Sequence, residues 1–320
     1  MKKLLFTMLI IGSVYSTATA ANQYSAEKSN YKQTHPLRSE KRQSGAQTAN
    51  YLNEDYANTA QDCGKSTTPA FLCTGVLLRG TDAFSTSFNA WDPSPASVSS
   101  GGVSFSYLRH DAKFNKLAYG YNNGFIFFPY FYAPDDQGID TNIDIMCSFP
   151  IDAGTENRSN KGCGASNSYP TQSIPCQQQG IYDANGWYAH YEQGGGNAAY
   201  QCGFIVADES SYNVADAFYQ TILSMQKISY DSFYEQNELI LATWAQSKQD
   251  SLPIEAFFYL DGSADGKNSA QKNQQSFFNK TTNNIWVPVI KVTMPATVTL
   301  DATFTYNADD QLVPEPASLK

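Results

Sequence analysis

The sequence predicts an α+β fold with a mainly antiparallel sheet, a few helices and a cysteine-rich insertion held by disulfides. Eight short runs rich in β-branched and aromatic residues are bounded by Gly, Pro, Asn or Asp, as strands are. Only three stretches have apolar residues at helical spacing, and they do not alternate regularly with the runs, which favours α+β over α/β. The eight predicted strands lie within 74–80, 101–109, 124–132, 143–151, 201–207, 253–260, 285–294 and 297–306.

The three predicted helices follow from apolar spacing. Residues 213–226 form the best example, and 269–279 form a shorter one. Residues 230–247 predict a further helix with Asp231 as a possible N-cap, although a strand is the open alternative there. Residues 154–203 are rich in Gly, Asn, Ser and Gln and predict a long loop excursion, either a binding loop or a surface insertion without a role in chemistry.

The composition divides the chain into four parts. Residues 1–20 have a basic start, an apolar run and a small-residue "ATA" end, which is typical of a signal peptide. Residues 21–60 are polar and predict a flexible leader. Residues 61–306 are apolar and aromatic and predict a single domain, and 307–320 predict a loose C-terminal tail.

The charge excludes some partners. The net charge of −9 becomes −11 when Lys2 and Lys3 leave with the signal peptide, so we expect no non-specific binding to nucleic acid. The apolar stretch 125–133 is interrupted by Pro129 and is shorter than the roughly 18 residues that a membrane helix needs. We therefore expect a protein without a membrane span, secreted to the periplasm or beyond the cell.

The six cysteines all follow the predicted signal peptide, and an even number in a secreted chain favours three disulfides. Pairing sequence neighbours gives Cys63–Cys73 and Cys163–Cys176, which leaves Cys147–Cys202 as a long-range bridge. A zinc site is the alternative. Because the chain has no C-x-x-C pair and its three histidines are scattered, we expect no metal.

Several common catalytic motifs are absent from the sequence, among them G-x-S-x-G, H-E-x-x-H, the P-loop and G-x-G-x-x-G. His110 and His190 are candidate bases without a recognisable partner. Arg79 is a stronger candidate, because it ends the apolar run Val76-Leu77-Leu78. It either holds an anion on a rigid strand or is simply a strand end at the surface.

Ser104 and Ser106 flank Phe105, so on a strand both hydroxyls point to one face and the aromatic ring to the other. Such a pair positions a ligand or a carboxylate, or is simply the polar side of a half-exposed strand.

The candidate carboxylates are Glu238, which precedes the apolar run Leu239-Ile240-Leu241, and Glu255, which lies inside a more apolar run. Gln236 shares a face with Glu238 only if this stretch is a strand. Glu255 is either a buried structural acid or the catalytic carboxylate, because a buried carboxylate must be hydrogen-bonded.

The order of an arginine at a strand end ("LLRGT"), an S-x-S strand ("SFS") and a Q-x-E ("QNE") resembles the Arg–Ser–Glu signature of ADP-ribosyltransferase toxins. More specifically, the chain resembles the halovibrin-type secreted bacterial NAD glycohydrolases. The similar stretches are "CTGVLLRGT", "AWDPSP", "GGVSFSYLR", "CSFPIDAGTENR", "GCG", "NELILATW" and "LPIEAFFY".

The resemblance implies an ADP-ribosyltransferase-like core and a hydrolase that cleaves the nicotinamide–ribose bond of NAD through an oxocarbenium-like transition state. NAD is then the substrate, and no separate cofactor is implied. Arg79 would hold the pyrophosphate, Ser104 and Ser106 would orient the carboxylate, and Glu238, with Glu255 as its rival, would stabilise the ribosyl cation. The residues expected to contact NAD are Arg79, Gln236, Phe105 and Trp244.

Gln236 stands where arginine-modifying toxins have a glutamate, so the implied activity is hydrolysis of NAD, with transfer to a host protein as a further possibility. The long separation between Ser106 and Glu238 requires the cysteine-rich segment to be inserted between the halves of such a core. The competing interpretation is a secreted protein that binds a glycan or receptor without catalysis, which the 21 Tyr and 19 Phe residues favour.

Overall fold

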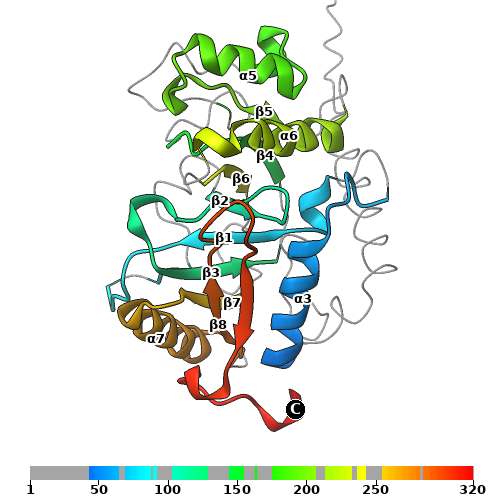
Figure 1. Ribbon diagram of the computed structural model, residues 1–320. Helices are drawn as coiled ribbons and strands as arrows, with labels where there is room; N and C mark the ends of the chain where they lie inside the picture. The colour runs from blue at the N-terminus through cyan, green and yellow to red at the C-terminus, as the bar shows by residue number, and fades with distance from the viewer. Residues whose placement is uncertain are drawn as a thin grey trace, which may run out of the picture.

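The described residues form one sheet of nine strands, most of which are labelled in Figure 1. The computed structural model describes residues 43–64, 69–87, 89–91, 103–128, 144–154, 163, 175–206, 213–232, 236–242, 254–281 and 284–319. The predicted class is confirmed as a mixture of helices with a mostly antiparallel sheet, and among the strands that the structure describes only β7 and β8 are parallel neighbours.

The strand order is β5-β4-β6-β2-β1-β3-β7-β8-β9, so strands distant in sequence are neighbours. All eight predicted strands are present, and a ninth, β6, lies in the stretch 230–247, where a strand was the alternative to the predicted helix. The strands are β1 (Val76–Gly80), β2 (Val103–Leu108), β3 (Asn123–Phe127), β4 (Asp144–Phe149), β5 (Phe204–Ile205), β6 (Glu238–Ala242), β7 (Ile254–Leu260), β8 (Val289–Thr293) and β9 (Thr303–Tyr306).

The described residues contain four α-helices: α3 (Gly45–Ala57), α5 (Ala184–Gln193), α6 (Val214–Ser232) and α7 (Ala264–Lys280). Helices α6 and α7 confirm two predictions. The helix predicted over 230–247 is wrong, because α6 ends at Ser232 and β6 begins at Glu238. None of these helices is long and apolar enough to cross a membrane.

The sheet has a hydrophobic core on each face. Neighbouring residues of β1 separate into the two cores, Leu77 into one and Leu78 into the other, as the alternation of a strand requires. Helices α6 and α7 contribute Phe218, Ile222, Met225, Ala270 and Phe277 to the Leu77 side. Helix α3 contributes Ala49, Leu52 and Tyr56 to the Leu78 side.

The flexible leader predicted for residues 21–60 is corrected by α3. Ser44 caps this helix in a capping box with Gln47, and Leu52 and Tyr56 are buried. The apolar face was missed because it consists of a few residues at wide spacing in a polar segment. Residues 21–42 lie outside the described residues.

The C-terminal tail is not loose either. Asp310 is buried between Tyr259 and Lys267, which both donate to its carboxylate. Gln311 exchanges two hydrogen bonds with the main chain of Val289, at 2.7 and 2.9 Å. The tail therefore binds to β7, α7 and β8 through polar side chains, a kind of packing that hydrophobic patterning does not reveal.

All six cysteines form disulfides, but two of the three predicted pairs are wrong. Cys63–Cys73 is confirmed, whereas the other bridges are Cys147–Cys163 and Cys176–Cys202. Cys147 lies on β4, next to β5, and its bridge holds Cys163 against the sheet. The second bridge closes a small core with α5, where Trp187 and Tyr191 stack and Trp187 Nε1 donates to Cys202 O. The segment 154–203 is therefore partly helical rather than only a loop.

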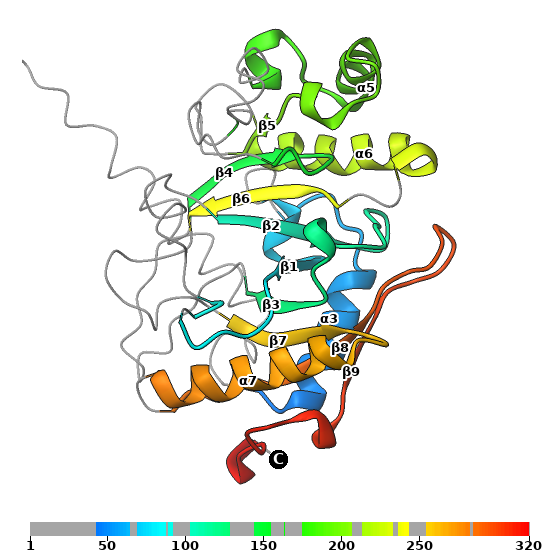
Figure 2. The ribbon, with the colours of Figure 1, turned by 90° about the vertical axis from the view of Figure 1, so that its left-hand side faces the viewer.

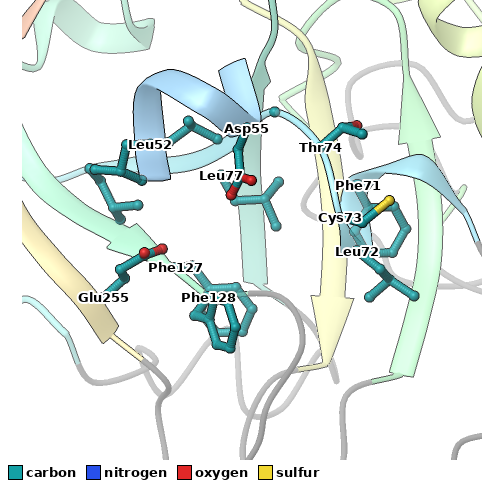
Figure 3. Close-up of a pocket in the computed structure, with 13 residues that line it drawn as sticks. Leu52, Asp55, Phe71, Leu72, Cys73, Thr74, Leu77, Phe127, Phe128 and Glu255 are labelled. Carbon is teal, nitrogen blue, oxygen red and sulfur yellow. The ribbon is translucent and has the colours of Figure 1, made fainter. Parts of the chain in front are cut away.

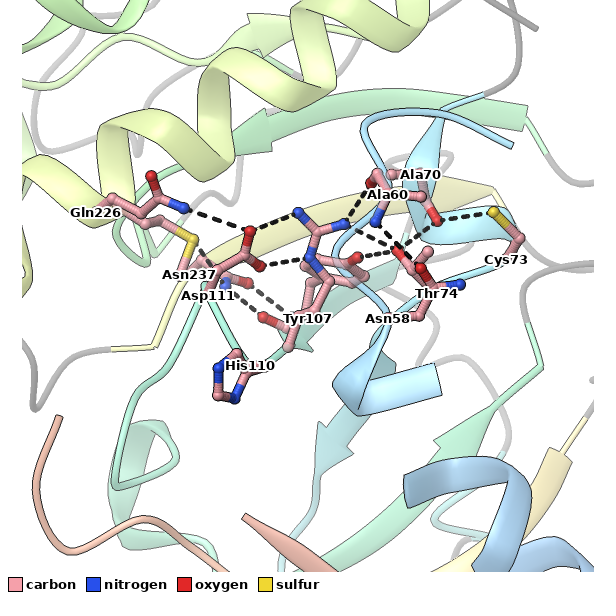
Figure 4. A network of polar contacts seen from close by, with 12 residues as sticks. Asn58, Ala60, Ala70, Cys73, Thr74, Tyr107, His110, Asp111, Gln226 and Asn237 are labelled. Carbon is pink, nitrogen blue, oxygen red and sulfur yellow. Dashed lines mark hydrogen bonds and ion pairs between the residues drawn. The ribbon is translucent and has the colours of Figure 1, made fainter. Parts of the chain in front are cut away.

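A network of polar contacts surrounds the buried side chain of Arg109, and Figure 4 labels its partners Asp111, Ala60 and Thr74. The side chain of Arg109 is fully buried and forms two hydrogen bonds with the carboxylate of Asp111, at 2.6 and 3.0 Å. Its Nη1 also donates to Ala60 O and to Thr74 Oγ1, whose hydroxyl in turn contacts the Tyr107 hydroxyl at 2.7 Å. Because the charge is both paired and hydrogen-bonded, its burial is tolerated.

Candidate functional site

The pairing of β2 with its neighbours brings two predicted serines and a predicted carboxylate to one face of the sheet. Leu78 of β1 pairs with Ser106, and Phe105 pairs with Leu239 of β6. Continuing this antiparallel register by one residue sets Ser106 opposite Glu238. Because residues alternate between faces, Ser104 and Ser106 share a side with Leu78 and Glu238. The strand alternative for this stretch is therefore the correct one.

A pocket of about 710 Å³, which includes space open to solvent, lies on this face. We call it the β1–β2–β6 pocket. It collects predicted site residues from three strands together with residues that the sequence did not indicate. Its lining is Leu78, Arg79, Gly80, Ser104, Phe105, Ser106, Ala118, Tyr119, Tyr121, Asp152, Gly154, Gln236 and Glu238.

Glu238 is buried at this site, with 3% of its surface exposed. Its two carboxylate oxygens accept from different elements: Oε1 from the Ser104 hydroxyl at 2.5 Å, and Oε2 from the main-chain N–H of Ala153 at 3.3 Å. Both oxygens of this buried carboxylate therefore have a hydrogen-bond donor, as buried polar groups require. The carboxylate is thereby fixed in direction, which an electrostatic catalyst needs.

Arg79 borders the same pocket from the end of β1. Its Nη1 donates to the main-chain oxygen of Ser104 at 2.6 Å, so the guanidinium lies across the strand that carries the serines. Burial raises the pKa of the Tyr121 phenol, and the positive charge of Arg79 acts in the opposite direction. The positive charge of Arg79 therefore acts on Tyr121, another residue of the pocket lining.

Gln236 contacts the protein at both ends of its carboxamide. Oε1 accepts from Ala118 N at 3.0 Å, and Nε2 donates to the carboxylate of Asp152 at 2.9 Å. The sequence predicts Gln236 as a group that contacts NAD. The structure places Gln236 in the pocket lining, where its carboxamide connects Ala118 with Asp152.

The predicted ring contacts are corrected in one case. Phe105 borders the pocket, but only 2% of its surface is exposed and its ring packs against Phe127 and Phe125, with centroids 4.7 and 6.2 Å away. The ring is therefore part of the core and cannot stack on a ligand. Trp244, the other predicted stacking residue, lies outside the described residues.

Glu255 lies in a different place from Glu238. It is the extra residue of a β-bulge on β7, between Ile254, which pairs with Phe127, and Ala256, which pairs with Ile126. It is half-buried and lines a smaller space of about 250 Å³ with Asp55 of α3. Figure 3 shows both carboxyl groups pointing toward this space. The structure thus separates the two rival carboxylates into two pockets.

Neither histidine candidate lines the β1–β2–β6 pocket. His110 pairs with Asp301 at 2.8 Å on the surface, and His190 lies on α5. The described residues contain no group of three metal-ligating side chains.

Sequence reasoning missed Asp152, Tyr119 and Tyr121, which complete the pocket wall. Asp152 follows β4, and the tyrosines lie in the turn before β3. No motif marks them, because they meet the serines only through the order β4-β6-β2-β1-β3.

Comparisons of the chain with family models, with curated proteins and with solved structures found no match.

Proposed function

We propose that the protein is a secreted NAD glycohydrolase whose catalytic site is the β1–β2–β6 pocket. The observation that supports this proposal is the convergence of Arg79, Ser104, Ser106 and Glu238 on one pocket from three neighbouring strands. The same residues, in the same order along the chain, are those that the resemblance to the Arg–Ser–Glu enzymes implies. An ADP-ribosyltransferase-like core belongs to the same proposal.

The chemistry assigned to the site is displacement of nicotinamide by water. The bond between the nicotinamide nitrogen and ribose C1′ breaks, and its electron pair leaves with neutral nicotinamide. The positive charge that develops on the ribose is stabilised by the Glu238 carboxylate, which Ser104 and Ala153 hold in place. Water then adds to C1′ and loses a proton, which gives ADP-ribose.

Arg79 is assigned to the pyrophosphate of NAD. A guanidinium carries five N–H donors and suits phosphate oxygens, and its bond to Ser104 O sets its position relative to the catalytic carboxylate. Ser106 completes the polar face of β2, where the ribose would lie.

The secreted location belongs to the proposal and is supported by the three disulfides, which are typical of oxidising compartments. The test is to incubate the purified, oxidised protein with NAD and to follow free nicotinamide and ADP-ribose in equal amounts. A candidate host protein added to the same reaction would show transfer as label that stays with the protein. Absence of nicotinamide release would leave the non-catalytic binding protein as the better interpretation.

A further inference from the structure

The turn that carries Tyr119 has two unusual properties. Tyr119 is 83% exposed, the highest value among the large apolar and aromatic side chains of the described residues. Its backbone has φ 55° and ψ 12°, and only one other non-glycine residue in the described part of the chain has positive φ. A bulky residue rarely adopts this left-handed conformation, so neighbouring contacts must hold it there.

The turn is held by a hydrogen bond to Gln236, which lines the pocket. Gln236 accepts from the N–H of Ala118, the residue before Tyr119, at 3.0 Å. The other end of this carboxamide donates to Asp152, whose own N–H donates back to Gln236 O at 2.7 Å. Gln236 therefore connects the tyrosine turn to the segment after β4.

Tyr121 supports Tyr119 from the side. The two ring centroids are 5.6 Å apart at 54°. Tyr121 also lies so close to Gly80 that a Cβ at this glycine would approach its ring to 2.7 Å. Tyr121 thus lies against the end of β1, whereas the ring of Tyr119 stays largely open to solvent at the border of the pocket.

We propose that Tyr119 is a stacking platform for a planar heteroaromatic ring of a nucleotide, and that Gln236 is the positioning residue that holds this platform. The inference rests on the proposed function and adds a binding subsite to it. The pocket already offers a cation for an anionic group and a fixed carboxylate for a sugar. An exposed aromatic face at its border supplies the third element that a nucleotide needs, because every base has a π-face that stacks on an aromatic ring.

Ligand titration tests the platform with the folded protein, using three probes that are not turned over: ADP-ribose, nicotinamide, and ribose 5-phosphate, which has no base. Tyr119→Ala is expected to weaken ADP-ribose or nicotinamide binding by roughly tenfold, the scale of one lost base–aromatic stack, and to leave ribose 5-phosphate unchanged. Tyr119→Phe should bind as the wild type does. The matched control is Tyr182→Ala, which removes another exposed tyrosine, with 58% exposure, outside the pocket lining.

A reciprocal exchange tests Gln236. Gln236→Glu keeps the acceptor for Ala118 N but sets a carboxylate against Asp152, so we expect the KM for NAD to rise with little change in kcat. Adding Asp152→Asn restores a donor to this contact and the original net charge, and should return KM toward the wild-type value. In a Tyr119→Ala background, Gln236→Glu should add little, because the two act through one platform.

The outcomes separate this inference from the proposed function. If the wild type cleaves NAD but Tyr119→Ala binds both base-containing probes normally, the platform is wrong and the glycohydrolase stands. If binding depends on Tyr119 but NAD is not cleaved, the platform stands and the activity is wrong. A wild type that binds neither base-containing probe overturns the platform, and overturns the glycohydrolase as well if it also fails to cleave NAD. Independent, additive effects of Tyr119→Ala and Gln236→Glu would overturn the positioning role.

Discussion

The Ser104 hydroxyl donates to the carboxylate of Glu238 across the boundary between β2 and β6, although 134 positions separate the two residues. Removing this hydroxyl in Ser104→Ala leaves Glu238 with fewer donors and a less defined direction. We expect roughly a tenfold loss of kcat for NAD, the scale of one hydrogen bond to a charged group. Ser106→Ala is the matched comparison, because it removes a hydroxyl from the same face of β2 and leaves the hydrogen bond between Ser104 and Glu238 intact. A larger loss in Ser106→Ala would reverse the assignment.

Glu238 and Glu255 are distinguished by turnover. Glu238→Gln keeps the size of the side chain but removes the negative charge, so NAD cleavage should fall by roughly 10²-fold or more while the fold is retained. Glu255→Gln changes a residue of the other pocket and should leave kcat within about threefold of wild type, because the linings of the two pockets share no residue. Nicotinamide release and thermal unfolding of both variants make the comparison. A folded but inactive Glu255→Gln with an active Glu238→Gln would move catalysis to the Asp55 pocket.

Buried Arg109 is expected to contribute to stability rather than activity. Arg109→Met leaves Asp111, Ala60 O and Thr74 without their shared donor, and should lower the free energy of unfolding by about 3 kcal/mol. Urea denaturation measures the change. Lys291→Met breaks an ion pair with Asp261 at 3.6 Å in which both side chains are partly exposed, and should cost less than about 1 kcal/mol. Equal effects in the two variants would contradict the role of burial.

The disulfide pattern is open to direct mapping. Proteolysis of the oxidised protein should release linked peptides for Cys63–Cys73, Cys147–Cys163 and Cys176–Cys202. Replacing both Cys176 and Cys202 with Ser frees a loop with a sequence separation of 26 and should cost about 3.5 kcal/mol on the chain-entropy estimate. Mass spectrometry that finds a Cys147–Cys202 peptide would contradict the structure.

The β8–β9 hairpin projects beyond the sheet, as Figure 2 shows. Asp301 in this hairpin pairs with His110 and Lys113, so the stability of this contact should depend on pH. Hydrogen bonding to Lys113, with His110 as a second partner, holds the pKa of Asp301 below its usual value of 3.8. Since the folded pKa is the lower one, the stabilisation is present above pH 3.8 and is lost as the pH falls through the folded pKa.

Because Asp301 is 51% exposed, the effect should be small. At about pH 6 the melting temperature of the wild type should be slightly higher than that of Asp301→Asn. The difference should disappear below the pKa that Asp301 has in the folded protein. A difference in melting temperature that persists unchanged into strong acid would show that Asp301 acts by some other route.

Local pattern predicted most of the strands, because short β-branched runs between turn residues carry their own signal. It did not decide between helix and strand for β6, where Leu239-Ile240-Leu241 is apolar without alternation and suits a helix or a buried strand equally. It failed for α5 because the helix contains Gly186 and begins in a polar loop. The pairs Cys147–Cys163 and Cys176–Cys202 depended on which segments the tertiary fold brings together, and no local signal in the sequence reports this.

The candidate site shows the same division. Arg79, Ser104 and Glu238 were predictable from their chemistry and order, and the structure brings them to one pocket. Phe105 was misassigned because a strand sends alternate residues to opposite faces, and the ring belongs to the core. Asp152 and the Tyr119 turn required the tertiary structure.

Helix α3 contacts the C-terminal part of the chain, so the domain cannot be completed before that part has been synthesised. The N–H of Gly45 donates to the carboxylate of Glu315, which also accepts from Tyr306, and α3 packs on β9. The contact joins positions 270 residues apart. A chain emerging from the ribosome or from a translocation channel therefore presents α3 long before β9 exists, so the contacts of α3 with β9 and Glu315 form only after the last residues have arrived. Completion of this domain is a post-synthetic event, and a chain shortened before Phe304 should remain a substrate for chaperones and proteases.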